Sequence, residues 1–171
     1  MNLTRREILT AFAQRSAALA GVAAGTLGWA GTALGSAGTG RGDTPAQIAW
    51  LTWPAGLQRA AAEHKAMGLF VYADWCPHCR ELEPLFRDPE IVRAARGLVM
   101  VRHNADEVAP WLRERFGRFG TYVPRLFFLH PDGAMAEEIQ SGNPKFPYFY
   151  QPTDGEQLRG AMRRATALAA R

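Results

Sequence analysis

The two cysteines of this chain, Cys76 and Cys79, are its most informative residues chemically, because only two residues separate them. A Cys-x-x-Cys spacing is too short to join distant elements as a structural disulfide does. The remaining uses of the motif are thiol–disulfide redox chemistry, half of a metal site, or haem attachment. Haem attachment requires a histidine directly after the second cysteine, and residue 80 is arginine. The spacing therefore favours redox chemistry.

A metal site is the main alternative use of the two cysteines. A structural zinc site needs four ligands, and the chain has no second Cys-x-x-Cys motif. Its four histidines follow no ligand spacing; they are His64, His78, His103 and His130. We therefore predict no metal and no cofactor, and we keep copper or zinc binding by Cys76, Cys79 and His78 as an alternative.

The residues around the motif predict a strand, a turn and a helix in that order. Residues 69–74 are an almost continuous apolar run, as in a central strand covered on both faces. A helix is expected from the motif to about Phe86, with a kink at Pro84. Cys76 then lies at a helix N-terminus, where free N–H groups and the helix dipole favour the attacking thiolate. We predict that Cys76 is the exposed attacking thiol and that Cys79 resolves the mixed disulfide.

Further elements follow from apolar spacing and turn residues. Helices are predicted over 55–67, ended by Gly68, and over 88–95, 108–116 and a terminal segment that starts at a Thr153…Glu156 capping box. Strands are predicted over 98–103, 125–129 and 134–139, the last two joined as a hairpin by Pro131-Asp132-Gly133. This alternation predicts an α/β fold with a mixed central β-sheet flanked by helices.

The first 37 residues have the features of an export signal. Arg5-Arg6 precede Ile8-Leu9, as in twin-arginine signals, and residues 17–37 are uncharged and rich in Ala and Gly. Small residues between 33 and 37 offer cleavage sites. Residues 38–46 read as a linker and 47–171 as the folded domain. We therefore predict a periplasmic protein; an uncleaved leader would tether it to the membrane, and general secretory export is the alternative route.

Composition sets broader limits. The chain has 171 residues, is 47% hydrophobic and 21% charged, and has a formal charge of +4. These values are ordinary for a globular protein. No stripe of Lys and Arg with interleaved aromatic residues is visible, so we predict no nucleic-acid partner.

Three features in order resemble the thioredoxin superfamily. They are the strand that leads into Trp75-Cys76-x-x-Cys79, Pro84 eight residues after the first cysteine, and Val123-Pro124 before a later strand. The resemblance implies a thioredoxin-like fold in which Pro84 bends the active-site helix and a cis Pro124 lies against the cysteines. It also implies a substrate groove at Trp75, Val123 and Pro124.

A narrower resemblance is to the anterior gradient group of small endoplasmic-reticulum proteins. It rests on residues 48–50, 121–131 and 143–150. The Pro77-His78 dipeptide is similar to that of DsbA-type oxidants, so we expect both residues to tune the redox potential. Thioredoxins and DsbA-type proteins have a buried acidic residue six positions before the first cysteine. This chain has Phe70 at that position. Water, Glu81 or Glu83 would have to accept the proton of Cys79.

These features predict a thiol–disulfide oxidoreductase that acts on cysteines of exported proteins, as an oxidase or isomerase, with a membrane or soluble redox partner. A non-catalytic chaperone or partner-binding module and a disulfide reductase are the alternatives. The aromatic residues Phe146, Tyr148, Phe149 and Tyr150 are predicted to pin a loop to the core rather than to form a binding patch. Tyr122 and Arg125 fit equally well as strand-end surface residues or as groove residues.

Overall fold

A mixed three-stranded sheet forms the centre of the fold. The computed structural model describes residues 47–170, so the predicted export signal (1–37) and linker (38–46) lie outside the described residues. The sheet has the order β2-β1-β3, with β1 over Met67–Tyr72, β2 over Val99–Asn104 and β3 over Arg125–Leu129. Strand β1 pairs in parallel with β2 and antiparallel with β3. These two pairings confirm the predicted mixed sheet. The apolar runs that form β1 and β3 are almost wholly buried.

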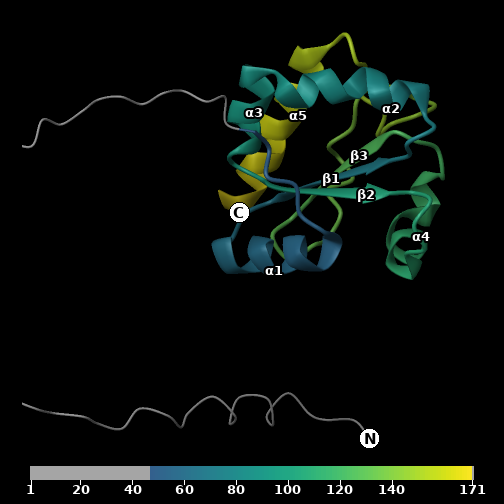
Figure 1. The fold of residues 1–171 in the computed structure, drawn as a ribbon. Coiled ribbons are helices and arrows are strands. Elements are labelled where there is room, and N and C mark those ends of the chain that lie inside the picture. Colours follow the sequence, from purple (N-terminus) through teal and green to yellow (C-terminus); the bar gives the residue numbers. More distant parts are fainter. Residues whose placement is uncertain (1–46, 171) are drawn as a thin grey trace, which may run out of the picture. The chain divides into compact units, whose positions relative to one another are not determined.

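Helices cover both faces of the sheet (Figure 1). One face packs against α1 (Trp53–Glu63) and α4 (Pro110–Phe116). The other packs against α2 (Pro77–Leu82), α3 (Pro89–Ala95) and α5 (Gly155–Thr166). Alternate residues of β1 divide between the two cores: Phe70 belongs to one, and Leu69 and Val71 to the other. None of the helices within residues 47–170 has the length and hydrophobicity needed to cross a membrane.

The active-site helix changes its hydrogen-bonding pattern close to Pro84. Helix α2 ends at Leu82 and continues as a 3₁₀-helix, η1, over Glu83–Arg87. A proline has no N–H for the helical ladder, so a tighter turn replaces the α-helix at this point. Asp88 then caps α3 by accepting hydrogen bonds from the N–H groups of Glu90 and Ile91 at 2.7 and 3.3 Å. The interrupted active-site helix and the new helix after Asp88 are both as predicted.

Several predicted boundaries are wrong. Helix α1 ends at Glu63 with His64 in the left-handed region (φ 53°), and Gly68 lies inside β1. A Cβ on Gly68 would meet the sulfur of Met100 at 2.8 Å, so this glycine serves close packing rather than helix termination. The predicted capping box also fails, because Asp154, not Thr153, caps α5 by accepting from the N–H of Gln157.

The predicted strand over 134–139 is reduced to a single bridge between Leu129 and Met135. The turn at Pro131-Asp132-Gly133 forms, with Gly133 at φ 82° and the N–H of His130 donating to the carbonyl of Ala134. Beyond the bridge, the N–H of Ile139 donates to the carbonyl of Ala136, and both residues are buried. Burial three residues apart suits a turn, whereas a strand would bury alternate residues. The remaining 3₁₀-helices are η2 (Gly117–Phe119) and η3 (Ala167–Ala170).

Candidate active site

Cys76 and Cys79 lie where β1 gives way to α2. The N–H of Cys76 donates to the carbonyl of Ala73, which closes the turn, and Cys76 is the N-cap of α2. Its Sγ accepts a hydrogen bond from the N–H of Cys79 at 3.3 Å. Helix N-terminal N–H groups have no intrahelical acceptor, so a sulfur in this place takes one as its partner. The backbone therefore stabilises negative charge on Cys76.

Both cysteines are reduced and buried, each 3% exposed. The prediction that Cys76 is an exposed thiol is therefore wrong, because Val123 and Tyr72 pack over the pair. The two thiols still differ in their surroundings. Burial raises the pKa of the Cys79 thiol to about 12, and its hydrogen bond with Cys76 and the nearby charges of Cys76 and Glu83 add to the increase. Cys79 therefore stays protonated at neutral pH.

The loop before β3 reaches the cysteines from 47 positions along the chain. The Val123–Pro124 peptide bond is cis, as the family resemblance implied. The Sγ of Cys76 donates to the carbonyl of Val123 at 3.6 Å. Val123 and Pro124 thus lie beside the reactive sulfur, where a groove for substrate was expected.

Trp75 is 65% exposed beside the cysteines, and a carboxylate fixes its ring. The indole Nε1–H donates to both oxygens of Asp106 at 3.0 and 3.1 Å. Asn104 supports this arrangement, because it donates to Asp74 at 2.9 Å and accepts from the N–H of Asp106. Parallel pairing of β1 with β2 brings these loops together at one edge of the sheet. Trp75 is thus held in position as an exposed rim of the site.

His78 lies on the solvent side of α2, one residue before Cys79. Its Nδ1 is 2.9 Å from Glu81 Oε2, and its ring meets the ring of Phe149 edge-on at 5.7 Å. Pro77 takes the first helical position, where a missing N–H costs no hydrogen bond. A role for either residue in setting the redox potential stays a prediction.

Phe70 stands where thioredoxins and DsbA-type proteins have a buried acid, and it is fully buried in the core. Its register partner on β2 is Arg102, whose guanidinium binds Glu83 at 3.1 Å and lies over the ring of Tyr72. Glu83 is one helical turn beyond Cys79, and its N–H donates to the Cys79 carbonyl. The first residue of η1 therefore supplies a carboxylate one turn from Cys79, and an arginine from the sheet pairs with it.

Sequence reasoning missed one wall of the site. Tyr148 and Tyr150 are buried, as predicted for a loop pinned to the core. Phe146 and Phe149 are only half-buried and line a hollow of about 820 Å³ together with His78, Glu81, Tyr122 and Val123. Arg125 is buried, and it donates to the carbonyl of Gly120, so its interpretation as a surface residue is wrong. Aromatic residues between prolines give no sequence signal that separates core from groove.

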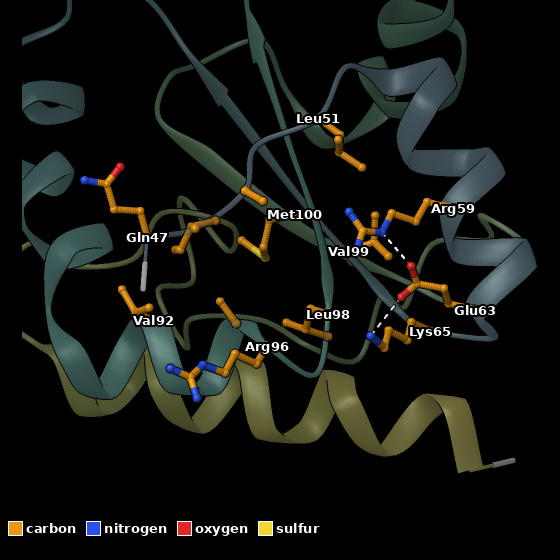
Figure 2. Close-up of a pocket in the computed structure, with 13 residues that line it drawn as sticks. Gln47, Leu51, Arg59, Glu63, Lys65, Val92, Arg96, Leu98, Val99 and Met100 are labelled. Carbon is orange, nitrogen blue, oxygen red and sulfur yellow. Dashed lines mark hydrogen bonds and ion pairs between the residues drawn. The ribbon is translucent and has the colours of Figure 1, made fainter. Parts of the chain in front are cut away.

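A separate hollow of about 190 Å³ lies between α1, α3 and β2 (Figure 2). Its polar side is an ion-pair group in which Glu63 binds Arg59 at 2.6 Å and Lys65 at 2.8 Å. Neither cysteine lines it. Within residues 47–170, no three His, Cys, Asp or Glu side chains gather as a metal site would require. The cysteine pair therefore remains the candidate active site.

Comparison with known proteins agrees with this geometry. Residues 49–131 match a family described as thioredoxin-like. The anterior gradient protein 2 homolog of Pongo abelii is 28% identical over 124 residues, which cover 71% of this chain and 69% of that protein. The thiol:disulfide interchange protein DsbD 2 of Pseudomonas aeruginosa is 36% identical over 131 residues, which cover 69% of this chain but only 22% of that protein. The chain therefore has a thioredoxin-like domain, and its relatives include anterior gradient and thiol:disulfide interchange proteins.

Proposed function

We propose that the Cys76–Cys79 pair donates its disulfide to cysteines of exported proteins, as an oxidase or isomerase in the bacterial periplasm. The observation that carries the proposal is that the two sulfurs have different surroundings. The N–H of Cys79 stabilises charge on Cys76 Sγ, whereas burial holds the Cys79 thiol protonated. An attacking or leaving thiolate next to a protonated resolving thiol is the arrangement that disulfide exchange needs.

In the oxidising direction, a substrate thiolate attacks Cys76 Sγ of the protein disulfide. The Cys76–Cys79 bond breaks, a substrate–Cys76 disulfide forms, and Cys79 leaves as a thiolate that takes up a proton. A second substrate thiolate then attacks the substrate sulfur, and Cys76 leaves as a thiolate. The raised pKa of Cys79 favours rapid protonation after the first step. A protonated Cys79 no longer attacks the mixed disulfide, so the reaction proceeds towards the oxidised substrate.

Two further features support this direction over reduction. The hydrogen bond to Cys76 stabilises the reduced protein, which makes its disulfide a stronger oxidant. Reduction of a substrate requires Cys79 to lose its proton, and Phe70 takes the place of the usual buried acid. The periplasmic location is supported by the predicted export signal over residues 1–37 and by the bacterial interchange protein among its relatives.

The reduction potential of the pair, measured by equilibration with glutathione, tests the direction. We expect about −120 to −180 mV, the range of oxidases and isomerases. A value near about −270 mV, as in thioredoxin, would instead indicate a reductase that needs an electron donor.

Two single variants test the roles of the sulfurs. Cys76→Ser should abolish oxidation of a reduced model substrate, because no attackable disulfide forms. Cys79→Ser should accumulate mixed disulfides on Cys76, which mass spectrometry would detect. Full activity of Cys76→Ser protein would refute the proposal.

A non-catalytic partner-binding module is the second candidate, and the aromatic hollow beside Val123 favours it. This candidate requires that Cys76→Ser/Cys79→Ser protein binds and protects its clients as well as the native chain does. Aggregation of a reduced, unfolded client in the presence of each protein measures this. Loss of all protection in the double variant would leave redox exchange as the function.

A further inference from the structure

The hollow lined by Phe146 and Phe149 adjoins the cysteine pair on one side only. It begins at Val123, whose carbonyl is the hydrogen-bond acceptor for Cys76 Sγ, and at His78 of α2. Trp75 and the loop over 105–109, which lie on the other rim of the site, do not line it. A polypeptide joined to Cys76 through its own cysteine would therefore place neighbouring residues in this hollow on one side of that cysteine.

The aromatic wall of the hollow is held rigidly. The carbonyl of Tyr148 accepts from the N–H of Leu126 on β3 at 2.9 Å, and the buried Tyr148 ring packs against Phe127. Asn143 Oδ1 accepts from the N–H groups of Lys145 and Phe146, each at 3.0 Å. The loop is thus fixed before any ligand arrives, and pre-organised surfaces lose little entropy on binding.

The rings that line the hollow form two contacting pairs. The Phe146 and Tyr122 rings meet at 4.9 Å, and the Tyr122 hydroxyl accepts from the N–H of Tyr148. At the other end, the ring of Phe149 meets His78. Aromatic side chains of this kind prefer edge-on contacts with further aromatic or aliphatic groups. Glu81 is the one carboxylate on the lining, and no Lys or Arg lines the hollow within the described part of the chain.

We propose that this hollow selects substrates: it binds an extended segment of an unfolded client that has a bulky apolar side chain, preferably aromatic, within a few residues of the reacting cysteine. The inference rests on the proposed disulfide exchange and adds its substrate class. Apolar side chains are accepted because the walls are aromatic. Acidic side chains are disfavoured, because Glu81 would repel them and the lining has no Lys or Arg.

The test uses the oxidised native protein and a set of cysteine peptides that differ at one position. Phe, Leu, Ala or Asp is placed at each of three positions on both sides of the cysteine, and the second-order rate constant of thiol oxidation is measured. We expect Phe and Leu to react roughly tenfold faster than Ala, about 1.4 kcal/mol, at positions on one side only. Asp should react more slowly than Ala there.

Variants of the two phenylalanines test whether the aromatic wall causes the preference for apolar side chains. Phe146→Ala and Phe149→Ala should each bring the Phe/Ala rate ratio close to one, whereas Phe149→Leu should retain most of it. Gln58→Ala is the control, because Gln58 is an exposed residue of α1 that does not line the hollow. Each ratio compares two peptides on one protein, so changes in the intrinsic reactivity of the pair cancel. A ratio that survives in Phe146→Ala and Phe149→Ala would overturn the assignment.

Failure of the inference and failure of the proposed function give different results. Equal rates for all peptides would overturn the substrate class and leave disulfide exchange standing. If no peptide is oxidised, the proposed disulfide exchange is wrong. Binding of peptides with serine in place of cysteine to Cys76→Ser/Cys79→Ser protein then tests the apolar hollow by itself. Tighter binding of the Phe peptide than of the Ala peptide would support the apolar hollow, and equal affinities would overturn it.

Discussion

At the scale of single residues, the redox pair is defined by unequal surroundings of two identical side chains. Both cysteines are buried to the same extent, yet Cys76 Sγ accepts the N–H of Cys79 at the start of α2, whereas the effect of burial dominates at Cys79. At Cys79, burial disfavours the charged form of the thiol and raises its pKa. The chemical asymmetry of the pair therefore comes from burial, which raises the pKa of Cys79, and from the backbone hydrogen bond at Cys76, not from a difference in exposed fraction.

The raised pKa of Cys79 predicts that the reduced protein loses stability at alkaline pH. Folded Cys79 has a pKa of about 12 against an ordinary value of 9.0, so the unfolded chain releases this proton at lower pH. The folded state then binds more protons between these values, and its free energy of unfolding falls as pH rises. The slope from this thiol is at most about 1.4 kcal/mol per pH unit. Urea unfolding of reduced protein from pH 8 to 11 measures it.

Cys79→Ser protein is the control for the other groups that titrate in this range, among them Tyr122 and Tyr148. The difference in unfolding free energy between the two reduced proteins should shrink steadily above about pH 9. A difference that does not change with pH would show that the folded Cys79 thiol has no raised pKa.

At the scale of elements, helix packing against the sheet depends on small residues at the points of closest approach. Gly56 of α1 faces β2, and a Cβ there would overlap the side chain of Val101 and lie 3.2 Å from Met67. Val101 is buried in the centre of that face and has little room to move. The position of α1 relative to β2 is therefore set by the absence of a side chain at residue 56.

Gly56→Ala tests this packing. Alanine favours a helix by about 1 kcal/mol over glycine, but overpacking costs about 1–3 kcal/mol, so we expect a net loss of up to about 2 kcal/mol in unfolding free energy. Chemical denaturation measures it. In a Val101→Ala background the overlap disappears, and Gly56→Ala should become neutral or stabilising. Destabilisation of the same size in both backgrounds would contradict the steric explanation.

Asp88→Ala tests the start of α3, the helix that follows the active-site helix. Asp88 accepts from two N–H groups that would otherwise be unpaired, so its loss should cost about 1 kcal/mol. Asp88→Asn keeps an acceptor and should cost less. Thermal or urea unfolding distinguishes the two, and equal stability of the Ala variant and the native protein would rule out the cap.

At the scale of the whole molecule, the loop over 140–152 joins the active site to both the sheet and the last helix. Tyr148 is bound through its carbonyl to β3, and its ring packs against Phe119 and Phe127. Gln157 of α5 donates to the carbonyl of Ser141 at 2.8 Å. The wall formed by Phe146 and Phe149 thus depends on contacts with elements far from it in sequence.

Tyr148→Ala should therefore weaken both the fold and the wall. Loss of a buried aromatic ring costs about 3–5 kcal/mol, and amide hydrogen exchange over 140–152 should accelerate more than elsewhere. Tyr148→Phe keeps the ring and should lose about 1 kcal/mol or less. Unchanged exchange over 140–152 in the alanine variant would show that Tyr148 does not hold the loop.

Local patterns predicted the elements close to the motif well. The residues of β3 and the start of α3 after Asp88 were predicted correctly. The disturbance of the active-site helix at Pro84 was predicted as a kink, but the α-helix ends at Leu82 and continues as a 3₁₀-helix. Apolar runs, proline and a capping aspartate act within a few residues, so the sequence shows them directly. Gly68 and Thr153 misled for the opposite reason. Gly68 leaves room for the side chain of Met100, and Asp154 rather than Thr153 caps α5. The local sequence pattern shows neither of these outcomes.

The sequence by itself determined the chemistry: two thiols three positions apart at a strand-to-helix junction, with Pro77 and His78 between them. It also identified Val123 and Pro124 through resemblance. Only the tertiary structure decided that both thiols are buried, that Glu83 pairs with Arg102, and that the aromatic loop divides into two core tyrosines and two groove phenylalanines. The reason is physical. Covalent spacing fixes which groups react, whereas burial and groove shape arise from packing between segments tens of residues apart.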